Sequence, residues 1–174
     1  MIKIVSLNKE NLKEWDQSNT PFSLTGRVIP ALENGQWTVS EERFTNAKTT
    51  KFPAEEPDES YLKDPHKQLY FAYLNGENVG QIRMFKNWNK FGYIENIAIK
   101  AGYRHAGIGQ QLFETAEKWA RANQCVGLQL EAQDDNLNAC RFYQKQGMQL
   151  GGVDTLFYTA NPNISVALQW YKLF

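Results

Sequence analysis

Residues 103–112 constrain the fold of this chain more than any other segment, because a strand-like run precedes them and a helix-like run follows them. The segment holds Gly107 and Gly109, and residues 110–121 after it carry apolar side chains at helical spacing. A strand, a glycine-containing loop and a helix N-terminus together form an anion-binding element. Free backbone N–H groups point outward there, and the helix dipole adds partial positive charge. The segment therefore predicts a site for a phosphate or diphosphate group.

The remaining pattern places this loop in an α/β fold. Strand-like runs are expected at residues 1–7, 27–32, 36–45, 69–74, 78–85, 91–99, 126–132, 152–159 and 164–174, and helical runs at 9–17, 110–121 and 136–146. Most neighbouring strands are joined by short turns, which predicts a layered fold built on one mostly antiparallel sheet. The exception is the helical crossover within residues 91–132, whose two strands are expected to be parallel.

Bulk properties limit the classes of function. The 174 residues suit a single domain with its own core, and 19 basic residues balance 19 acidic ones, which argues against a general nucleic-acid binder. The two cysteines have neither metal-ligand nor disulfide spacing. No apolar run approaches membrane-spanning length, so we expect a cytoplasmic protein with no metal and no membrane partner.

Two common phosphate loops do not fit residues 103–112. A Walker A loop ends in glycine-lysine followed by serine or threonine, whereas Gly109 is followed by two glutamines. A Rossmann loop needs a third glycine and an early strand. The spacing that remains is Arg104, two residues, Gly107, one residue and Gly109. This pattern resembles the acetyl-coenzyme A loop of the GCN5-related N-acetyltransferases, the GNAT superfamily.

Further motifs carry the same resemblance, which covers residues 69–158. The strand before the loop ends in Ile97-Ala98-Ile99, residues 130–143 match the family's fifth strand and following helix, and Met148 replaces the usual phenylalanine after Gly147. Methionine fills similar core space, so the last departure is mild. The resemblance implies the GNAT fold, in which the family's fourth and fifth strands, here residues 91–99 and 126–132, form the parallel pair. It also implies acetyl-CoA as cosubstrate.

The resemblance assigns cofactor contacts residue by residue. Backbone groups around Ile97, Ala98 and Ile99 would pair with the pantetheine arm. The loop amides would hold the pyrophosphate; they belong to Arg104, His105, Ala106, Gly107, Ile108, Gly109 and Gln110. The Arg104 side chain has either a structural role or a phosphate contact. Asn136 and Asn138 would bond the pantetheine or cap the helix, and Asn136 is the better cap candidate.

Three residues are the candidates for acid–base chemistry. Glu95 and Glu131 lie within apolar strands, where an unpaired carboxylate is costly, so each is a candidate base or ammonium anchor. Either carboxylate could instead be tied up in structural hydrogen bonds. Tyr143 lies where the family places a tyrosine beside the coenzyme sulfur, so it is the candidate general acid. Its alternative role is that of a core aromatic residue. No cysteine nucleophile is required, because the amine would attack the thioester directly in a ternary complex.

A narrower resemblance, to streptothricin acetyltransferases, runs through the whole chain. It rests on residues 87–90, 93–98, 139–143, 152–156 and 170–174, and on an N-terminal element at 21–30. Streptothricins carry β-lysine and are polycationic, so carboxylates and aromatic faces are expected to bind them. Residues 53–64 carry five acidic residues and one lysine, and we expect residues 47–66 to form a mobile loop with a helical turn near 59–62. The candidate substrate residues are Trp37, Trp88, Tyr93, Glu95, Asp154 and Tyr158.

These readings predict a single N-acetyltransferase domain over residues 1–174, with a cofactor core at about 69–158 and a substrate-side segment at about 1–67. The predicted reaction is acetylation of a β-lysine amine of a streptothricin-type antibiotic, which would confer resistance. One alternative is acetylation of protein N-termini, lysines or polyamines. Another is a coenzyme A-fold domain that binds a ligand without catalysis. A homodimer is possible.

Overall fold

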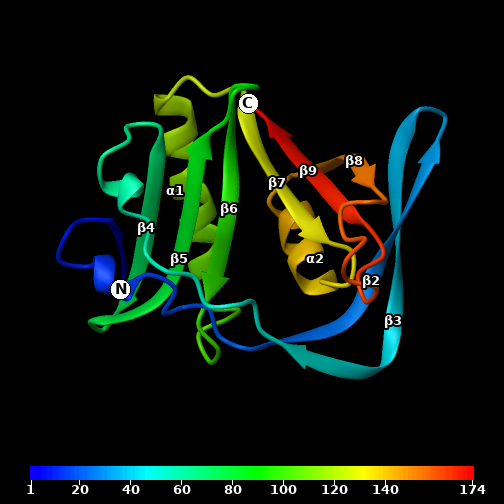
Figure 1. The fold of residues 1–174 in the computed structure, drawn as a ribbon, viewed down its shortest axis with the longest axis horizontal. Helices are drawn as coiled ribbons and strands as arrows, with labels where there is room; N and C mark the ends of the chain where they lie inside the picture. The colour runs from blue at the N-terminus through cyan, green and yellow to red at the C-terminus, as the bar shows by residue number, and fades with distance from the viewer. The chain divides into compact units, whose positions relative to one another are not determined.

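The computed structural model describes residues 1–174, and Figure 1 shows the chain as a ribbon. Two compact units divide it. The first comprises residues 1–22, 51–128 and 174, and the second comprises residues 23–50 and 129–173. The prediction of a single domain with a cofactor core at 69–158 stays a prediction.

The first unit is built on four antiparallel strands in the order β1, β4, β5, β6. Their bounds are β1 Ile2–Ser6, β4 Lys67–Leu74, β5 Glu77–Lys86 and β6 Phe91–Ile99. Asn75 and Gly76, both with positive φ, make the tight turn from β4 to β5, as the asparagine-glycine pair predicts. Seven consecutive residues of β5, from 78 to 84, are buried, as expected for a central strand covered on both faces.

Helix α1, Ile108–Ala122, covers one face of these strands (Figure 1). Its buried stripe repeats at helical spacing and consists of Ile108, Leu112, Phe113, Ala116, Trp119 and Ala120. Gly80 on β5 allows the close approach, because a Cβ atom there would meet Ile108 and Leu112 at 3.1 Å. The helix is thereby fixed against β5 and β6, with its N-terminus following the glycine loop.

The second unit contains β7 (Gly127–Gln133, whose first two residues belong to the first unit), β9 (Ala167–Leu173) and β8 (Gln149–Asp154), in that order in the sheet. Helix α2, Leu137–Lys145, buries Leu137, Cys140 and Tyr143. The side chain of Asn136 caps α2 by accepting the N–H of Ala139 at 3.3 Å, as the sequence predicts. A two-stranded hairpin, β2 (Phe22–Glu33) and β3 (Gln36–Thr50), completes the fold.

Three predicted elements are wrong in type or extent. Residues 9–17 form only a 3-10 turn, η1 (Leu12–Glu14), because the Asn8 side chain accepts the N–H groups of Glu10 and Asn11 in place of a helix. Strand β3 continues to Thr50, into the segment predicted as loop. Residues 155–159 are a turn and not the end of a strand, because the Asp154 side chain binds two of their backbone N–H groups. The helical turn near 59–62 is confirmed as η2 (Glu59–Leu62).

The predicted α/β class and its mostly antiparallel sheet are confirmed. The family's fourth and fifth strands, predicted as the parallel pair, correspond to β6 and β7 here, whereas β4 and β5 of this chain are antiparallel. No helix of the structure combines the length and the apolar character needed to cross a membrane.

Candidate active site

The glycine loop runs from the end of β6 to the start of α1. Gly102, His105 and Gly107 all have positive φ, and Gly107 occupies the N-cap position without any side-chain cap. The first turn of α1 carries no acidic residue. Its backbone donors are thus neither capped by a side chain nor opposed by a carboxylate, which suits an anionic group. Ile108 is buried, while His105, Ala106 and Gln110 are exposed.

Arg104 braces this loop. Its Nε donates to the carbonyl of Ile99 at 3.0 Å, and one terminal nitrogen donates to the carbonyl and hydroxyl oxygens of Thr20 at 3.2 and 3.1 Å. The Thr20 hydroxyl also accepts the N–H of Ala101 at 2.8 Å. These contacts are those of the structural role, and the alternative contact of Arg104 with a phosphate stays a prediction. Thr20 was missed by the sequence analysis, because nothing in its local pattern marks it.

A β-bulge in β6 sets the direction of Glu95. In the pairing with β5, Asn96 lies opposite Arg83 and Ile94 opposite Met84, so Glu95 is the unpaired extra residue. Bulges of this kind re-aim a side chain and are common near active sites. Beyond the bulge, regular pairing of β5 and β6 resumes, and Ile97, Ala98 and Ile99 lie opposite Ile82, Gln81 and Gly80.

Glu95 lies in a charged cluster of the first unit. Tyr61 donates its hydroxyl hydrogen to the Glu95 carboxylate, and Nε of Arg83 lies 3.3 Å from the same carboxylate oxygen. Arg83 also pairs with Glu55 at 2.6 Å and stacks on the Trp15 ring, 4.9 Å from its centroid. Burial, followed by the charges of Glu55 and Asp58, raises the pKa of Glu95 to about 7.

The acidic loop, residues 51–66, makes several contacts with the rest of the first unit, and its predicted mobility stays a prediction. The N–H of Glu55 donates to the Asp16 side chain at 3.2 Å, and the Asn19 side chain donates to the carbonyl of Phe52 at 3.3 Å. Phe52 packs on Phe22 with ring centroids 5.1 Å apart. With the Arg83–Glu55 ion pair, these contacts connect the loop to the rest of the first unit.

Glu131, in β7 of the second unit, has a simpler environment. The Tyr158 hydroxyl lies 3.0 and 2.9 Å from its two carboxylate oxygens, so one hydrogen is shared between them. Burial raises the pKa of Glu131 to about 7, and the hydrogen bond from Tyr158 opposes that rise. A carboxyl group with a pKa near neutrality is suited to accept a proton at working pH.

Helix α2 presents Tyr143 and Cys140 in the same unit. Tyr143 is 9% exposed, and burial, followed by the neighbouring Cys140 and Glu131, raises the pKa of its hydroxyl. The hydroxyl therefore stays protonated over the whole working range and can act as a donor. Burial also raises the pKa of Cys140 to about 12, which keeps this thiol protonated at neutral pH.

Three other predicted cofactor or substrate residues form hydrogen bonds within the protein. Asn136 caps α2, and Asn138 binds Thr25 and Ser23 of the hairpin, each at 3.4 Å. Asp154 accepts the N–H groups of Leu156 and Phe157.

The predicted aromatic residues lie in different settings. Trp88 is 90% exposed, and Tyr93 packs on Phe85 with ring centroids 5.3 Å apart. Trp37 lines a groove beside β8 that Trp170 also lines. None of the predicted catalytic residues lines this groove.

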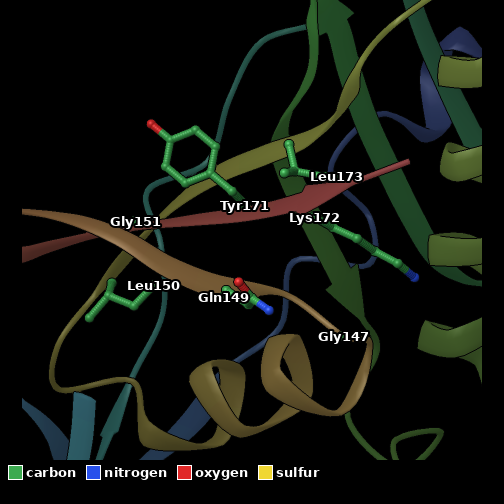
Figure 2. Close-up of a pocket in the computed structure, with 7 residues that line it drawn as sticks. All are labelled: Gly147, Gln149, Leu150, Gly151, Tyr171, Lys172 and Leu173. Carbon is green, nitrogen blue, oxygen red and sulfur yellow. The ribbon is translucent and has the colours of Figure 1, made fainter. Parts of the chain in front are cut away.

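Figure 2 shows a second hollow of the second unit, of about 410 Å³, over β8 and β9. It is lined by Gly147, Gln149, Leu150, Gly151, Tyr171, Lys172 and Leu173, which include no predicted catalytic, cofactor or substrate residue. Each unit therefore has candidate residues of its own, the glycine loop and Glu95 in the first and Glu131 in the second, and none of them lines the grooves at β8.

Comparison with known proteins identifies the class of protein that these features define. Residues 32–148 match the model of the Acetyltransferase (GNAT) family. The chain belongs to this family, which confirms the predicted N-acetyltransferase activity and acetyl-CoA as cosubstrate.

Similarity to individual proteins is more specific than the match to the family model. The chain is 38% identical to streptothricin acetyltransferase A of Bacillus subtilis over 98% of this chain and 99% of that protein. A solved Bacillus anthracis structure in complex with acetyl coenzyme A covers 100% of both chains at 30% identity and a TM-score of 0.92. A shorter match, 40% identical over 39% of this chain and 45% of the relative, is to a Bacillus subtilis protein named for N-acetylation of an alanine of ribosomal protein bS18.

Proposed function

We propose that this enzyme acetylates an amine of streptothricin-type antibiotics, at the β-lysine moiety, and thereby confers resistance. The observation that carries the proposal is the similarity to streptothricin acetyltransferase A over almost the full length of both chains. Such a match includes the acidic loop and the hairpin β2–β3, which lie outside the glycine-loop motif and are the segments expected to differ between acceptors.

The donor side of the proposal rests on the first unit. The amides of residues 104–110 hold the pyrophosphate of acetyl-CoA, because the loop backbone and the uncapped start of α1 favour an anion. Backbone groups of Ile97, Ala98 and Ile99 hold the pantetheine arm. Arg104 supports this arrangement from behind by tying the loop to Ile99 and Thr20. Asn136 and Asn138 act chiefly as the cap of α2 and the link to β2.

Glu131 is the proposed general base. An alkyl amine has a pKa of about 10.4, so it arrives mostly as ammonium and must lose a proton before attack. A carboxylate whose pKa is about 7 accepts that proton at pH 7–8 more readily than an ordinary glutamate. The free amine then attacks the thioester carbonyl, the new C–N bond forms and the C–S bond breaks, and the departing sulfur leaves as a thiolate.

Tyr143 is the proposed general acid for that thiolate. A thiolate of pKa near 8.5 is a poorer leaving group than a thiol that gains a proton as the bond breaks. The buried hydroxyl of Tyr143, with its raised pKa, is fully protonated and able to donate. In this scheme the ammonium nitrogen loses two protons: the first passes to Glu131 before attack, and the second leaves to solvent after the C–N bond has formed. The tyrosine proton passes to sulfur, and the protons balance when Tyr143 is reprotonated from solvent and Glu131 returns its proton to solvent.

Glu95 is the proposed ammonium anchor. Glu55 and Asp58 add negative charge around it, while Arg83 compensates only part of that charge. A streptothricin with several ammonium groups gains from such a field, and a substrate with a single amine gains less. The exposed Trp88 ring offers a face for a further cationic group.

The second candidate is N-acetylation of a protein amino terminus. The partial match to the bS18-alanine acetyltransferase favours it. The twelve-residue spacing between Glu131 and Tyr143 also resembles that of family members with this activity. The match covers less than half of either chain, so it carries less weight than the full-length similarity.

One assay separates the candidates. The enzyme is incubated with acetyl-CoA and, in separate reactions, streptothricin, a polyamine and a peptide with an N-terminal alanine, and thiol release is followed. We expect kcat/KM for streptothricin to exceed that for the peptide by at least about 100-fold, since lost multivalent charge contacts are worth several kcal/mol. The excess over the polyamine should be smaller, because a polyamine keeps several ammonium groups. Mass spectrometry of the product should locate one acetyl group on the β-lysine moiety. Release with the peptide and none with streptothricin would refute the proposal in favour of the second candidate.

A further inference from the structure

The turn at residues 155–160, between β8 and β9, is held by its own hydrogen bonds. The Asp154 carboxylate accepts the N–H groups of Leu156 at 2.8 Å and Phe157 at 3.0 Å. The carbonyl of Tyr158 accepts the N–H of Asn161 at 2.8 Å. Leu156 and Phe157 are 75% and 59% exposed, whereas Tyr158 is half-buried. The turn therefore leaves the side chains of Leu156 and Phe157 exposed to solvent and directs the Tyr158 side chain inward.

Tyr158 reaches both oxygens of Glu131 at nearly equal distances, 3.0 and 2.9 Å. A single hydrogen shared between two carboxylate oxygens holds the carboxylate plane in one orientation. A hydrogen bond to an ionised group is also among the stronger ones in proteins. The ring of Phe157 packs edge-on against the Tyr158 ring, with centroids 5.0 Å apart, which further limits rotation of the tyrosine.

The other titratable groups that face Glu131 within the second unit lie on α2. They are the Cys140 thiol and the Tyr143 hydroxyl, and both interact electrostatically with Glu131. Burial raises the pKa of each, so both are neutral at working pH and neither supplies a positive charge to the carboxylate. Tyr158 is the group that counteracts the effect of burial on Glu131.

We propose that Tyr158 is a positioning residue for the acetyl transfer, and that it orients the Glu131 carboxylate and keeps it available in its ionised form. The proposal deepens the proposed function and rests on Glu131 as the base. The prediction of Tyr158 as a substrate-binding residue stays a prediction beside this role. The turn at residues 155–160 then contributes to catalysis, because it positions the Tyr158 hydroxyl within hydrogen-bond distance of both Glu131 carboxylate oxygens.

The test uses Tyr158→Phe, which removes the hydroxyl and keeps the ring. Glu131 is titrated in the substrate-free protein by the ¹³C shift of its side-chain carboxyl carbon, and the pH profile of kcat/KM with streptothricin is recorded in parallel. We expect the Glu131 titration and the acidic limb of the profile both to move to higher pH, by about one unit, because a hydrogen bond to a charged group is lost. Activity should fall severalfold at pH 6.5 and little at pH 8.5, mainly through kcat.

Leu156→Gln is the matched control. It alters an exposed residue of the same turn that contributes no side-chain hydrogen bond to Glu131, so both midpoints should stay in place. Near-UV circular dichroism of both variants checks that the fold is kept.

Two results would overturn the inference in distinguishable ways. An unmoved Glu131 titration in a folded Tyr158→Phe would refute the role of Tyr158 and leave the proposed base untouched. A raised Glu131 titration with an unmoved pH profile would instead refute Glu131 as the base, and with it the catalytic role of Tyr158.

Discussion

Glu95 and Glu131 have the same raised pKa, about 7, for different reasons. Glu95 lies in a cluster where Glu55 and Asp58 add to the effect of burial and where Arg83 and Tyr61 contact the carboxylate. Glu131 owes its pKa to burial alone, against one tyrosine hydrogen bond. A charged, salt-sensitive cluster is suited to attract cations, whereas an uncharged environment is suited to proton transfer. This difference is the reason for which we propose binding for the first carboxylate and chemistry for the second.

The largest expected effect is that of Glu131→Gln, which removes the base and keeps a hydrogen-bond acceptor for Tyr158. We expect kcat with streptothricin at pH 8 to fall by about 10²–10⁴-fold, the usual contribution of a general base, with little change in KM. Stopped-time product analysis by mass spectrometry measures the slow rate. A fall of kcat by less than tenfold would mean that Glu131 has a structural role and is not the general base.

Tyr143→Phe should give the next largest effect. Loss of the proton donor should lower kcat by about 10–100-fold, while the dissociation constant of acetyl-CoA changes little. Turnover measures the first quantity and isothermal calorimetry the second. Tyr70→Phe, a half-buried tyrosine of β4, is the control and should behave as the parent does. Unchanged turnover in Tyr143→Phe would mean that Tyr143 only fills the core.

Glu95→Gln tests the other side of the comparison. Loss of the anchor should raise KM for streptothricin by about tenfold and change kcat little, because an ammonium–carboxylate contact at a partly exposed site is worth roughly one power of ten. The parent's KM should also rise with salt, since exposed charges are screened over about 8–10 Å at physiological ionic strength. A large fall in kcat with constant KM would place Glu95 in the chemical step.

Glu55→Gln should give a smaller change of the same kind. Glu55 pairs with Arg83 and raises the pKa of Glu95, so its loss should lower that pKa and weaken the negative field around the anchor. We expect KM for streptothricin to rise by about two- to threefold and to depend less on salt. Glu56→Gln is the matched control, because it removes the same charge from the neighbouring position, and should leave KM within error. Equal changes of KM in the two variants would mean that the loop acts only as a nonspecific acidic surface.

The smallest expected effect is on stability. A carboxyl group whose folded pKa of about 7 exceeds its ordinary 4.5 binds more protons when folded, so the free energy of unfolding should fall as pH rises from 4.5 to 7. Glu131→Gln mimics the protonated form of Glu131, so the variant should not lose this part of the free energy of unfolding as the pH rises. At pH 8 its melting temperature should exceed the parent's by about 2–4 °C, equivalent to roughly 1 kcal/mol, and at pH 4.5 the two should coincide. Calorimetry at both values provides the check, and a less stable variant at pH 8 would contradict the account of burial.

Local chemistry explains what could be predicted from the sequence. The Asn75-Gly76 turn, the Asn136 cap and the glycine loop depend on neighbouring residues, and the amphipathic stripe of α1 follows from its own spacing. The segment at 9–17 was mispredicted because the Asn8 side chain competes for the backbone N–H groups of Glu10 and Asn11.

Contacts between distant residues explain what could not be predicted. Tyr61 and Glu95 are 34 positions apart, and Tyr158 and Glu131 are 27 apart, so neither pairing leaves a local pattern. The position of Arg83 opposite the bulge depends on the register of β5 and β6, which the sequence alone leaves open. The sequence could therefore nominate both glutamates but could not tell them apart, because their partners distinguish them.

The most direct test of this division of roles is the pH dependence of kcat at saturating streptothricin between pH 5.5 and 9, recorded for the parent, Glu131→Gln and Glu95→Gln under the same conditions. The account predicts an acidic limb of kcat with a midpoint near pH 7 in the parent, its disappearance in Glu131→Gln, and its retention in Glu95→Gln, in which KM is the quantity that rises. A limb that persists in Glu131→Gln and disappears in Glu95→Gln would contradict the account and make Glu95 the base.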